Sequence, residues 1–187
     1  MNIQPKLIKE CIAQNRRSEY ELYKLTYSYL MSISIRYTKN QDLAKEYLNI
    51  SFLKILNNLK TYKEEIPFKA WIRKILINTL IDEYRKQKKL SEVIDYTEKN
   101  YDSTDFTELN SALEHLNTKD IYKEIAKLPP VTKQVFNLFV IDGYTHKEIA
   151  QLLNIEEGTS KWHLNAGRTK LKIALEKEIN LYKVEAQ

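Results

Sequence analysis

Glycine and proline are scarce in this sequence, with only 3 Gly and 4 Pro among 187 residues. Sandwiches, barrels and glycine-rich phosphate loops need many tight turns, and those turns depend largely on these two residue types. Because 43% of the residues are hydrophobic, the chain still has enough apolar side chains for packed cores. We therefore predict a folded, all-α protein.

Cysteine is represented by Cys11 alone, which excludes an internal disulfide and a thiolate metal cluster. The three histidines, His115, His146 and His163, are isolated from one another, and no paired-ligand or phosphate-loop motif occurs. No apolar run approaches the roughly 18 residues that a membrane-spanning helix needs. We expect a cytoplasmic protein with no membrane insertion, no metal and no cofactor, and we do not expect an enzyme.

The charge balance is basic, with 30 Lys and Arg against 25 Asp and Glu and a net charge of +5. Such an excess favours a polyanionic partner, because cations that neutralise phosphates release counterions. A basic cluster at residues 85–89 is followed by an acidic stretch at 91–116 with little helical periodicity. This shift in composition predicts a linker. Two interpretations of its acidity stay open: a solvated connector, or a segment that follows a basic channel on a partner.

Helical periodicity is clearest in residues 44–59, where apolar or small side chains recur at steps of three and four. The tyrosine-rich segment 18–37 shows the same spacing, which Asn40 and Gln41 interrupt. Residues 68–85 are apolar on more than one face, which predicts a buried helix central to a first domain. Asn78 lies within that helix among isoleucines, so its amide needs a partner.

The C-terminal part reads as a helix-turn-helix over residues 145–171. Thr145 and Glu148 form a capping-box pattern, and Gly143 before it suits a left-handed helix end. Asn154 occupies the turn, where a residue that tolerates positive φ is needed. The outer face of the second helix is predicted to carry Ser160, Lys161, Trp162, His163, Asn165 and Arg168. The alternatives are a hairpin whose polar face only meets water, and a Trp162 that packs against a neighbour.

With these residues in place, residues 7–175 resemble the extracytoplasmic-function (ECF) subfamily of bacterial RNA polymerase sigma factors. Four segments carry the resemblance through their order and spacing: AKEYLNISFLK (44–54), FKAWIRKILINTLIDEYR (68–85), LPPVTKQVF (128–136) and GYTHKEIAQLLNIEEGTSKWHLNAGR (143–168). The resemblance implies two small helical domains, region 2 at 1–90 and a region 4 helix-turn-helix at 118–187. A flexible linker at 91–117 would cross the polymerase toward the RNA exit path.

The resemblance also implies a function and partners. Core RNA polymerase and promoter DNA would be the main partners, with region 2 opening and capturing the minus-ten element and region 4 reading the minus-thirty-five element. An anti-sigma factor is the further partner expected of such a protein. The resemblance therefore predicts a sigma factor that directs promoter-specific transcription initiation.

Site residues follow from the same resemblance. Those implied to bind the polymerase are Ala44, Glu46, Tyr47, Asn49 and Phe52. Those implied to bind the minus-ten element are Tyr62, Lys63, Phe68, Trp71, Arg73, Lys74, Asn78, Arg85 and Lys86. Those implied to bind the minus-thirty-five element are Thr145, His146, Thr159, Ser160, Lys161, Trp162, His163, Asn165 and Arg168. For Trp71 the alternative is a core residue, since aromatic side chains on a buried helix mostly pack.

The sequence departs from the family pattern in two places. The polymerase-binding helix has Leu43, Asn49 and Ile50 where an acidic residue and a Gln-Glu pair are common. In the recognition helix, Glu156 replaces a capping hydroxyl residue, and Gly167 within a helix costs about 1 kcal/mol relative to Ala. A plain helix-turn-helix regulator without a polymerase partner is the competing class, but it leaves the basic, Asn-containing helix at 68–89 unexplained.

Overall fold

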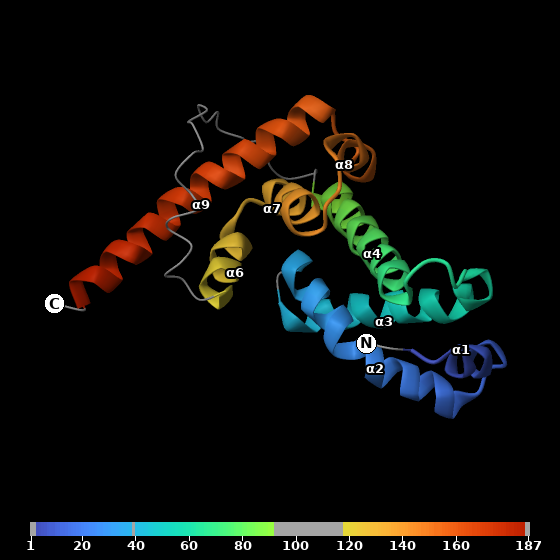
Figure 1. Cartoon of the computed structure of the whole chain (residues 1–187). Helices are drawn as coiled ribbons and strands as arrows, with labels where there is room; N and C mark the ends of the chain where they lie inside the picture. Colours follow the sequence, from blue (N-terminus) through green and yellow to red (C-terminus); the bar gives the residue numbers. More distant parts are fainter. Residues whose placement is uncertain (1–2, 39, 92–117, 186–187) are drawn as a thin grey trace. The chain divides into compact units, whose positions relative to one another are not determined.

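The computed structural model describes residues 3–38, 40–91 and 118–185, and every regular element within these ranges is a helix (Figure 1). The predicted all-α fold is thereby confirmed. The chain divides into two units, Met1–Ile94 and Asp95–Gln187. The predicted linker lies outside the described residues, except for Ser91, which ends a helix.

The first unit contains α1 (Pro5–Ile12), α2 (Arg16–Tyr37), α3 (Gln41–Asn58), a 3-10 turn (Leu59–Thr61) and α4 (Phe68–Ser91). Asparagine side chains start two of these helices. The Asn15 Oδ1 atom accepts from the backbone N–H groups of Arg17 and Ser18 at 3.0 and 3.2 Å, and Asn40 caps α3 through the Leu43 N–H at 2.9 Å. The break that Asn40 predicts in the sequence is therefore a helix cap.

Three long helices, α2, α3 and α4, pack against one another to form the core of the first unit. Leu22, Leu48 and Ile72 have no exposed surface. The periodic stripe predicted for residues 44–59 points inward as expected. Leu56 is half-buried, and the buried members are Ala44, Tyr47, Leu48, Ser51, Phe52, Ile55 and Leu59. Burial of these side chains fixes which face of α3 remains outside.

Cys11 lies in this core with 4% of its surface exposed, and burial raises its pKa to about 11, with smaller contributions from Glu19 and Glu10. Because the thiolate is the reactive form, we expect the folded protein to react with a thiol reagent at pH 8 at least about a hundredfold more slowly than an ordinary cysteine. The rate with a colorimetric disulfide reagent measures this, and the guanidinium-unfolded chain is the control. Equal rates for folded and unfolded protein would contradict the burial of Cys11.

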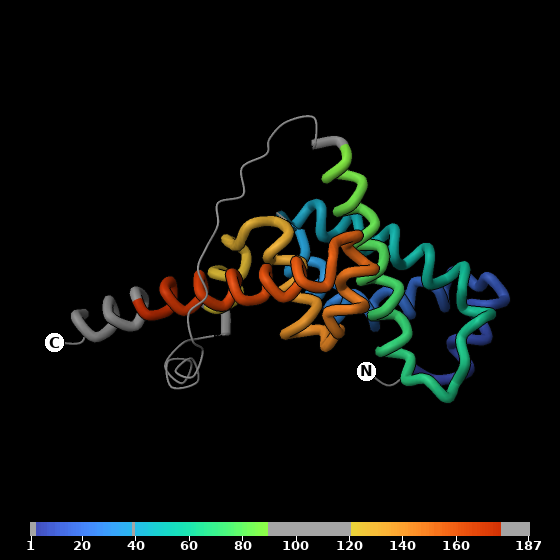
Figure 2. Tube along the Cα trace, turned by 90° about the horizontal axis from the view of Figure 1, so that it is seen from above, coloured from blue at the N-terminus to red at the C-terminus, as the bar shows by residue number. Residues whose placement is uncertain are grey.

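The second unit contains α6 (Thr118–Lys127), α7 (Pro130–Phe136) with a π-helical turn (Asn137–Ile141), α8 (His146–Leu153) and α9 (Glu157–Glu185). The local signals predicted for it are confirmed. Gly143 has φ 76°, Asn154 has φ 53°, and Thr145 and Glu148 form the capping box. Both views show α9 as one continuous helix, and its packing partners are α6, α7 and α8 (Figures 1 and 2).

Gly167 is required where α9 crosses α7. A Cβ atom built on Gly167 would lie 3.1 Å from Thr132 Cγ2 and 3.4 Å from Phe136 Cδ2. By contrast, a Cβ on Gly158, in the first turn of the same helix, would have no neighbour within 4 Å. The sequence shows only that Gly167 is a weak helix former, whereas the structure shows that a small residue permits the close approach of two helices.

Within the described residues, no helix is both long enough and apolar enough to cross a membrane.

Candidate nucleic-acid interface

One face of α4 carries a row of polar and aromatic side chains, which we call the α4 stripe: Trp71, Lys74, Asn78, Arg85 and Lys89. Their spacing of three, four, seven and four residues places them on one side of a helix. Each keeps part of its surface in solvent, whereas Ile72, Leu76 and Leu80 on the other side are buried. The α4 stripe thus carries three cations, and the exposed carboxylate of Asp82 lies on the same side of the helix between Asn78 and Arg85.

Three predicted minus-ten residues of α4 do not belong to this row: Phe68, Arg73 and Lys86. Arg73 lies about 140° around the helix from Asn78, counting about 100° per residue, and it already has an interaction within the fold. Phe68 is buried. Lys86 borders the stripe and is paired with Glu83 at 2.6 Å, a contact that raises the pKa of Lys86. Neighbouring residues on a helix are about 100° apart, so Arg73 cannot share the face on which the adjacent Lys74 lies.

Asn78 is half-buried in the middle of the stripe. Among the described residues, its side chain makes no hydrogen bond. A half-buried amide with two donors and an acceptor loses hydration without gaining a partner from the fold. Asn78 is therefore the residue of the stripe whose chemistry is best suited to an external ligand.

An aromatic cluster borders the stripe where α4 begins. The Tyr62 ring lies 5.2 Å from the Phe68 ring and 5.1 Å from the Trp71 ring, centroid to centroid. The Tyr62 hydroxyl donates to the Ile66 carbonyl at 2.8 Å, which closes the exposed loop that holds Lys63. The sequence offers two interpretations of Trp71, a core residue and a DNA-binding residue. Trp71 packs on this cluster and is still partly exposed, so its position is compatible with both.

On α3, three of the five predicted polymerase-binding residues are buried: Ala44, Tyr47 and Phe52. Their side chains pack in the core, and their contact with the polymerase stays a prediction. Tyr47 accepts a 2.5 Å hydrogen bond from Gln87 of α4, and Phe52 meets Tyr23 of α2 edge to face. Glu46 and Asn49 are exposed, and the Asn49 Oδ1 atom accepts from the Tyr23 hydroxyl at 2.9 Å.

The first half of α9 presents an outer face formed by Lys161, Trp162, Asn165, Thr169 and Lys172. Their spacing places them on one side of the helix, away from the buried Leu164 and Leu171. Thr159 is exposed in the first turn, and Arg168 is half-buried on the flank of the outer face. Sequence reasoning missed Thr169, although its position four residues after Asn165 was the available signal.

Ser160 and His163 were predicted on this outer face, and that placement is wrong. Ser160 is 0% and His163 3% exposed, because both point toward the helices that α9 crosses. The Ser160 hydroxyl pairs with His146 Nδ1 at 2.9 Å, and Thr132 of α7 pairs with His163 Nδ1 at 3.0 Å. These two hydrogen bonds fix the rotation of α9 about its axis.

Thr145 and His146 also have structural tasks. The Thr145 hydroxyl serves the capping box of α8, accepting from the Glu148 N–H at 3.3 Å. The His146 ring stacks on Phe139 with centroids 4.4 Å apart, in addition to its contact with Ser160. Both side chains keep some exposed surface at the start of α8.

Burial lowers the pKa of His146 below its ordinary value of 6.5, and nearby Lys161 and Arg168 lower it further. The unfolded chain therefore binds a proton at His146 more readily than the folded chain does. The contribution of His146 to the free energy of unfolding is fully present above about pH 6.5 and is lost as the pH falls toward the lower pKa of the folded state. We expect His146→Phe, which keeps the stacking but cannot titrate, to lose less stability than wild type between pH 7.5 and 5.5. Denaturant unfolding at both pH values measures this. An identical loss in both proteins would contradict the role of His146.

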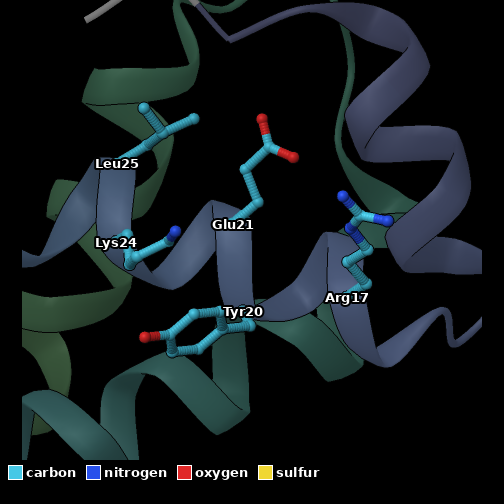
Figure 3. Close-up of a pocket in the computed structure, with 5 residues that line it drawn as sticks. All are labelled: Arg17, Tyr20, Glu21, Lys24 and Leu25. Atoms are coloured by element: carbon cyan, nitrogen blue, oxygen red, sulfur yellow. The ribbon is translucent and has the colours of Figure 1, made fainter.

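Among the described residues, no three His, Cys, Asp or Glu side chains are grouped to hold a metal ion. A shallow hollow of about 570 Å³ lies on α2, lined by Arg17, Tyr20, Glu21, Lys24 and Leu25 (Figure 3). Lys24 lies over the Tyr20 ring at 4.8 Å, and none of the five lining residues is a predicted site residue.

Comparison with known proteins identifies the same two regions. Family models described as Sigma-70 region 2 and as Sigma-70, region 4 match residues 22–90 and 118–171. The chain is 27% identical to RNA polymerase sigma factor SigV of Bacillus subtilis over 92% of this chain and 93% of SigV, and 32% identical to SigZ of the same organism over 73% and 75%. Among solved structures, it is similar to the sigma factor RpoE in complex with the anti-sigma factor NepR from Bartonella quintana, with a TM-score of 0.50 and 18% identity over 84% of this chain and 96% of RpoE.

Proposed function

This chain belongs to the extracytoplasmic-function subfamily of RNA polymerase sigma factors, which bind core polymerase and direct promoter-specific initiation, and from this premise we propose which of its surfaces performs each task. The proposed domains are region 2 at residues 1–90 and region 4 at 118–187, with a linker between them. In this division region 2 captures the minus-ten element and region 4 reads the minus-thirty-five element. Such a factor controls where initiation occurs and leaves catalysis to the polymerase.

Capture of the minus-ten element is assigned to the α4 stripe and the loop beside it. An extruded base needs hydrogen bonds along its edge and a protein wall that replaces its lost stacking. The Asn78 amide supplies the hydrogen bonds, and the rings of Tyr62 and Trp71 supply the wall. Lys63, Lys74, Arg85 and Lys86 hold the phosphates, whereas Phe68 acts only by supporting the aromatic cluster from beneath.

Recognition of the minus-thirty-five element is assigned to the outer face of α9 together with Thr159 and Arg168. Lysine and asparagine are side chains that pair with the major-groove edges of guanine and adenine, respectively. Thr145 and His146 lie at the start of α8, the helix that crosses the backbone in this motif. Ser160 and His163 contribute by holding α9 in its orientation.

Contact with the polymerase is assigned to the exposed side of α3, where Glu46 and Asn49 lie beside Leu53. Leu53 is 62% exposed, which is unusual for a large apolar side chain and is consistent with burial in a complex. The hydrogen bond from Tyr23 holds the Asn49 amide in place. Because this helix departs from the family pattern, its proposed contact residues are the exposed Glu46, Asn49 and Leu53.

We also propose an anti-sigma factor as a partner and the cytoplasm as the site of action. The similar sigma factor RpoE forms a complex with NepR, and any such regulator must cover surfaces that the polymerase or promoter requires. The outer faces of α3 and α9 are such surfaces in this chain. Transcription from promoter DNA takes place in the bacterial cytoplasm.

Run-off transcription tests the proposal. The observation that carries it is the α4 stripe, in which the half-buried Asn78 amide, without a partner among the described residues, lies between Lys74 and Arg85. We expect core RNA polymerase of the source bacterium to produce discrete start sites on fragmented genomic DNA only when the protein is added. Start sites that are absent, together with specific duplex binding by the protein alone, would favour the helix-turn-helix regulator instead.

A further inference from the structure

Trp162 differs in kind from the other members of the outer face of α9. Those are cationic or polar: Lys161, Asn165, Thr169 and Lys172. Trp162 is partly exposed and lies five residues after the helix begins at Glu157. Residues near the start of a recognition helix are the ones that reach base edges in this motif. A large and mostly apolar ring therefore lies where the proposed contact with bases is made.

A buried histidine holds the indole ring from the protein side. The Trp162 ring meets the His163 ring edge to face, with centroids 4.8 Å apart and an interplanar angle of 76°. His163 is 3% exposed, and its Nδ1 atom pairs with the Thr132 hydroxyl of α7 at 3.0 Å. A side chain that is placed in advance loses less conformational entropy when it contacts a ligand. Trp162 is thus pre-organised on the surface of the helix.

The neighbouring position on the preceding turn carries no side chain. Gly158 lies four residues before Trp162 and therefore on the same side of the helix. A Cβ atom added to Gly158 would meet nothing within 4 Å, so no close packing within the fold requires a glycine there. The glycine leaves open space beside Trp162 on the first turn, through which another molecule can reach the ring.

The hydrogen-bonding capacity of the indole is restricted to one N–H donor, with no acceptor. Within the part of the chain that the structure describes, no hydrogen bond engages this N–H group. In the major groove, thymine presents the acceptor O4 and, beside it, its 5-methyl group. An apolar ring with a single donor at its rim matches this combination of an apolar group and an acceptor.

The other three bases match an indole less well. Guanine presents two acceptors, adenine an acceptor and an amino donor, and cytosine an amino donor, and none of the three carries a methyl group. An apolar ring laid against such an edge removes water from polar groups without replacing all of their hydrogen bonds. Thymine is the base whose major-groove edge offers an apolar group for the ring to cover.

We infer that Trp162 is a specificity-determining residue that reads the 5-methyl group of a thymine in the upstream promoter element. This inference rests on the proposed function of α9. The ring covers the methyl group, and the indole N–H is available to the O4 atom of the same base. His163 is a positioning residue in this arrangement, because it holds the ring but does not face the DNA.

The test removes the methyl group and leaves base pairing intact. Holoenzyme is assembled from core polymerase and the full chain. In a promoter recovered by the wild-type holoenzyme, each thymine of the upstream element is replaced in turn by deoxyuridine, which pairs with adenine but lacks the 5-methyl group. Competition binding at one fixed salt concentration gives the ratio of the affinities for the thymine and deoxyuridine promoters.

Three variants are compared with the wild type. Trp162→Ala removes the ring, and Trp162→Gln replaces it with a long polar side chain of high helix propensity, which keeps the test valid if alanine disturbs the fold. Asn165→Ala is the matched control, because it truncates another side chain of the same outer face. Circular dichroism melting of the full chain checks that each variant folds.

We expect at least one thymine whose replacement weakens wild-type binding by about fourfold, the effect of exposing one buried methyl group. Both Trp162 variants should bind the two promoters equally, whereas Asn165→Ala should keep the wild-type ratio. Equal binding of all the thymine and deoxyuridine promoters by the wild type overturns the inference, and so does a ratio that persists in both Trp162 variants. A wild-type holoenzyme that selects no upstream sequence would instead overturn the proposed function of α9.

Discussion

Asn78→Ala is expected to lower the rate of open-complex formation by about tenfold to a hundredfold. The substitution removes the edge hydrogen bonds of a captured base, and each such loss in a desolvated pocket costs about 1–3 kcal/mol. The packing of α4 should be unaffected, because Asn78 is only half-buried and has no hydrogen bond to another described residue. Fluorescence of 2-aminopurine placed in the minus-ten element follows strand opening by the holoenzyme.

Gln41→Ala is the matched control for this experiment, because it also removes a side-chain amide. Gln41 is exposed in the first turn of α3, about 140° around the helix from Glu46, lies outside the α4 stripe and has no side-chain hydrogen bond to a described residue. It should open the promoter at the wild-type rate. A promoter that is already unpaired at the minus-ten element should still bind the Asn78→Ala holoenzyme more weakly, because the lost contacts are made to the single strand. Full binding there would show that Asn78 does not contact the captured base.

Gly167→Val should destabilise the second unit by about 1–3 kcal/mol. The added side chain begins 3.1 Å from Thr132 Cγ2 and 3.4 Å from Phe136 Cδ2, so α9 must move away from α7 or distort its rotamers. The gain in helix propensity over glycine is at most about 1 kcal/mol and opposes only part of this cost. Trp162 fluorescence during urea unfolding, in a Trp71→Phe background, reports on the second unit alone.

Gly158→Ala provides the opposite expectation on the same helix. Its Cβ meets nothing within 4 Å, so the substitution should stabilise the second unit by up to about 1 kcal/mol. The pair of variants separates helix propensity from packing. Equal stabilisation by both substitutions would mean that α9 does not approach α7 as closely as described.

Features fixed by neighbouring residues were predictable from the sequence. The capping box of Thr145 and Glu148 and the positive φ of Gly143 and Asn154 need only local chain geometry, and all are present. The inward stripe of α3 was equally clear, because its period is that of one helix face. Asn78 was singled out from the contrast between a polar amide and its isoleucine neighbours.

Errors arose where tertiary packing decides which side of a helix is covered. Ser160 and His163 are polar, so the sequence suggested an outer position, yet the crossing of α7 and α8 over α9 buries both. Their burial is tolerated because Thr132 and His146 offer hydrogen bonds, and nothing in the local sequence indicates those partners. Gly167 was misjudged for the same reason, since its closest neighbour is 35 positions away in the chain.

The hydrogen bonds of Ser160 and His163 have an implication for protein engineering. They face inward, and the outer-face side chains of Lys161, Asn165 and Thr169 take no part in them, whereas the Trp162 ring meets the His163 ring edge to face with centroids 4.8 Å apart. These three outer positions can therefore be mutated independently of the two hydrogen bonds, with Trp162 kept. A library randomised at Lys161, Asn165 and Thr169 should retain the wild-type melting temperature across most members while diverging in promoter choice, which makes this helix a scaffold for orthogonal transcription switches.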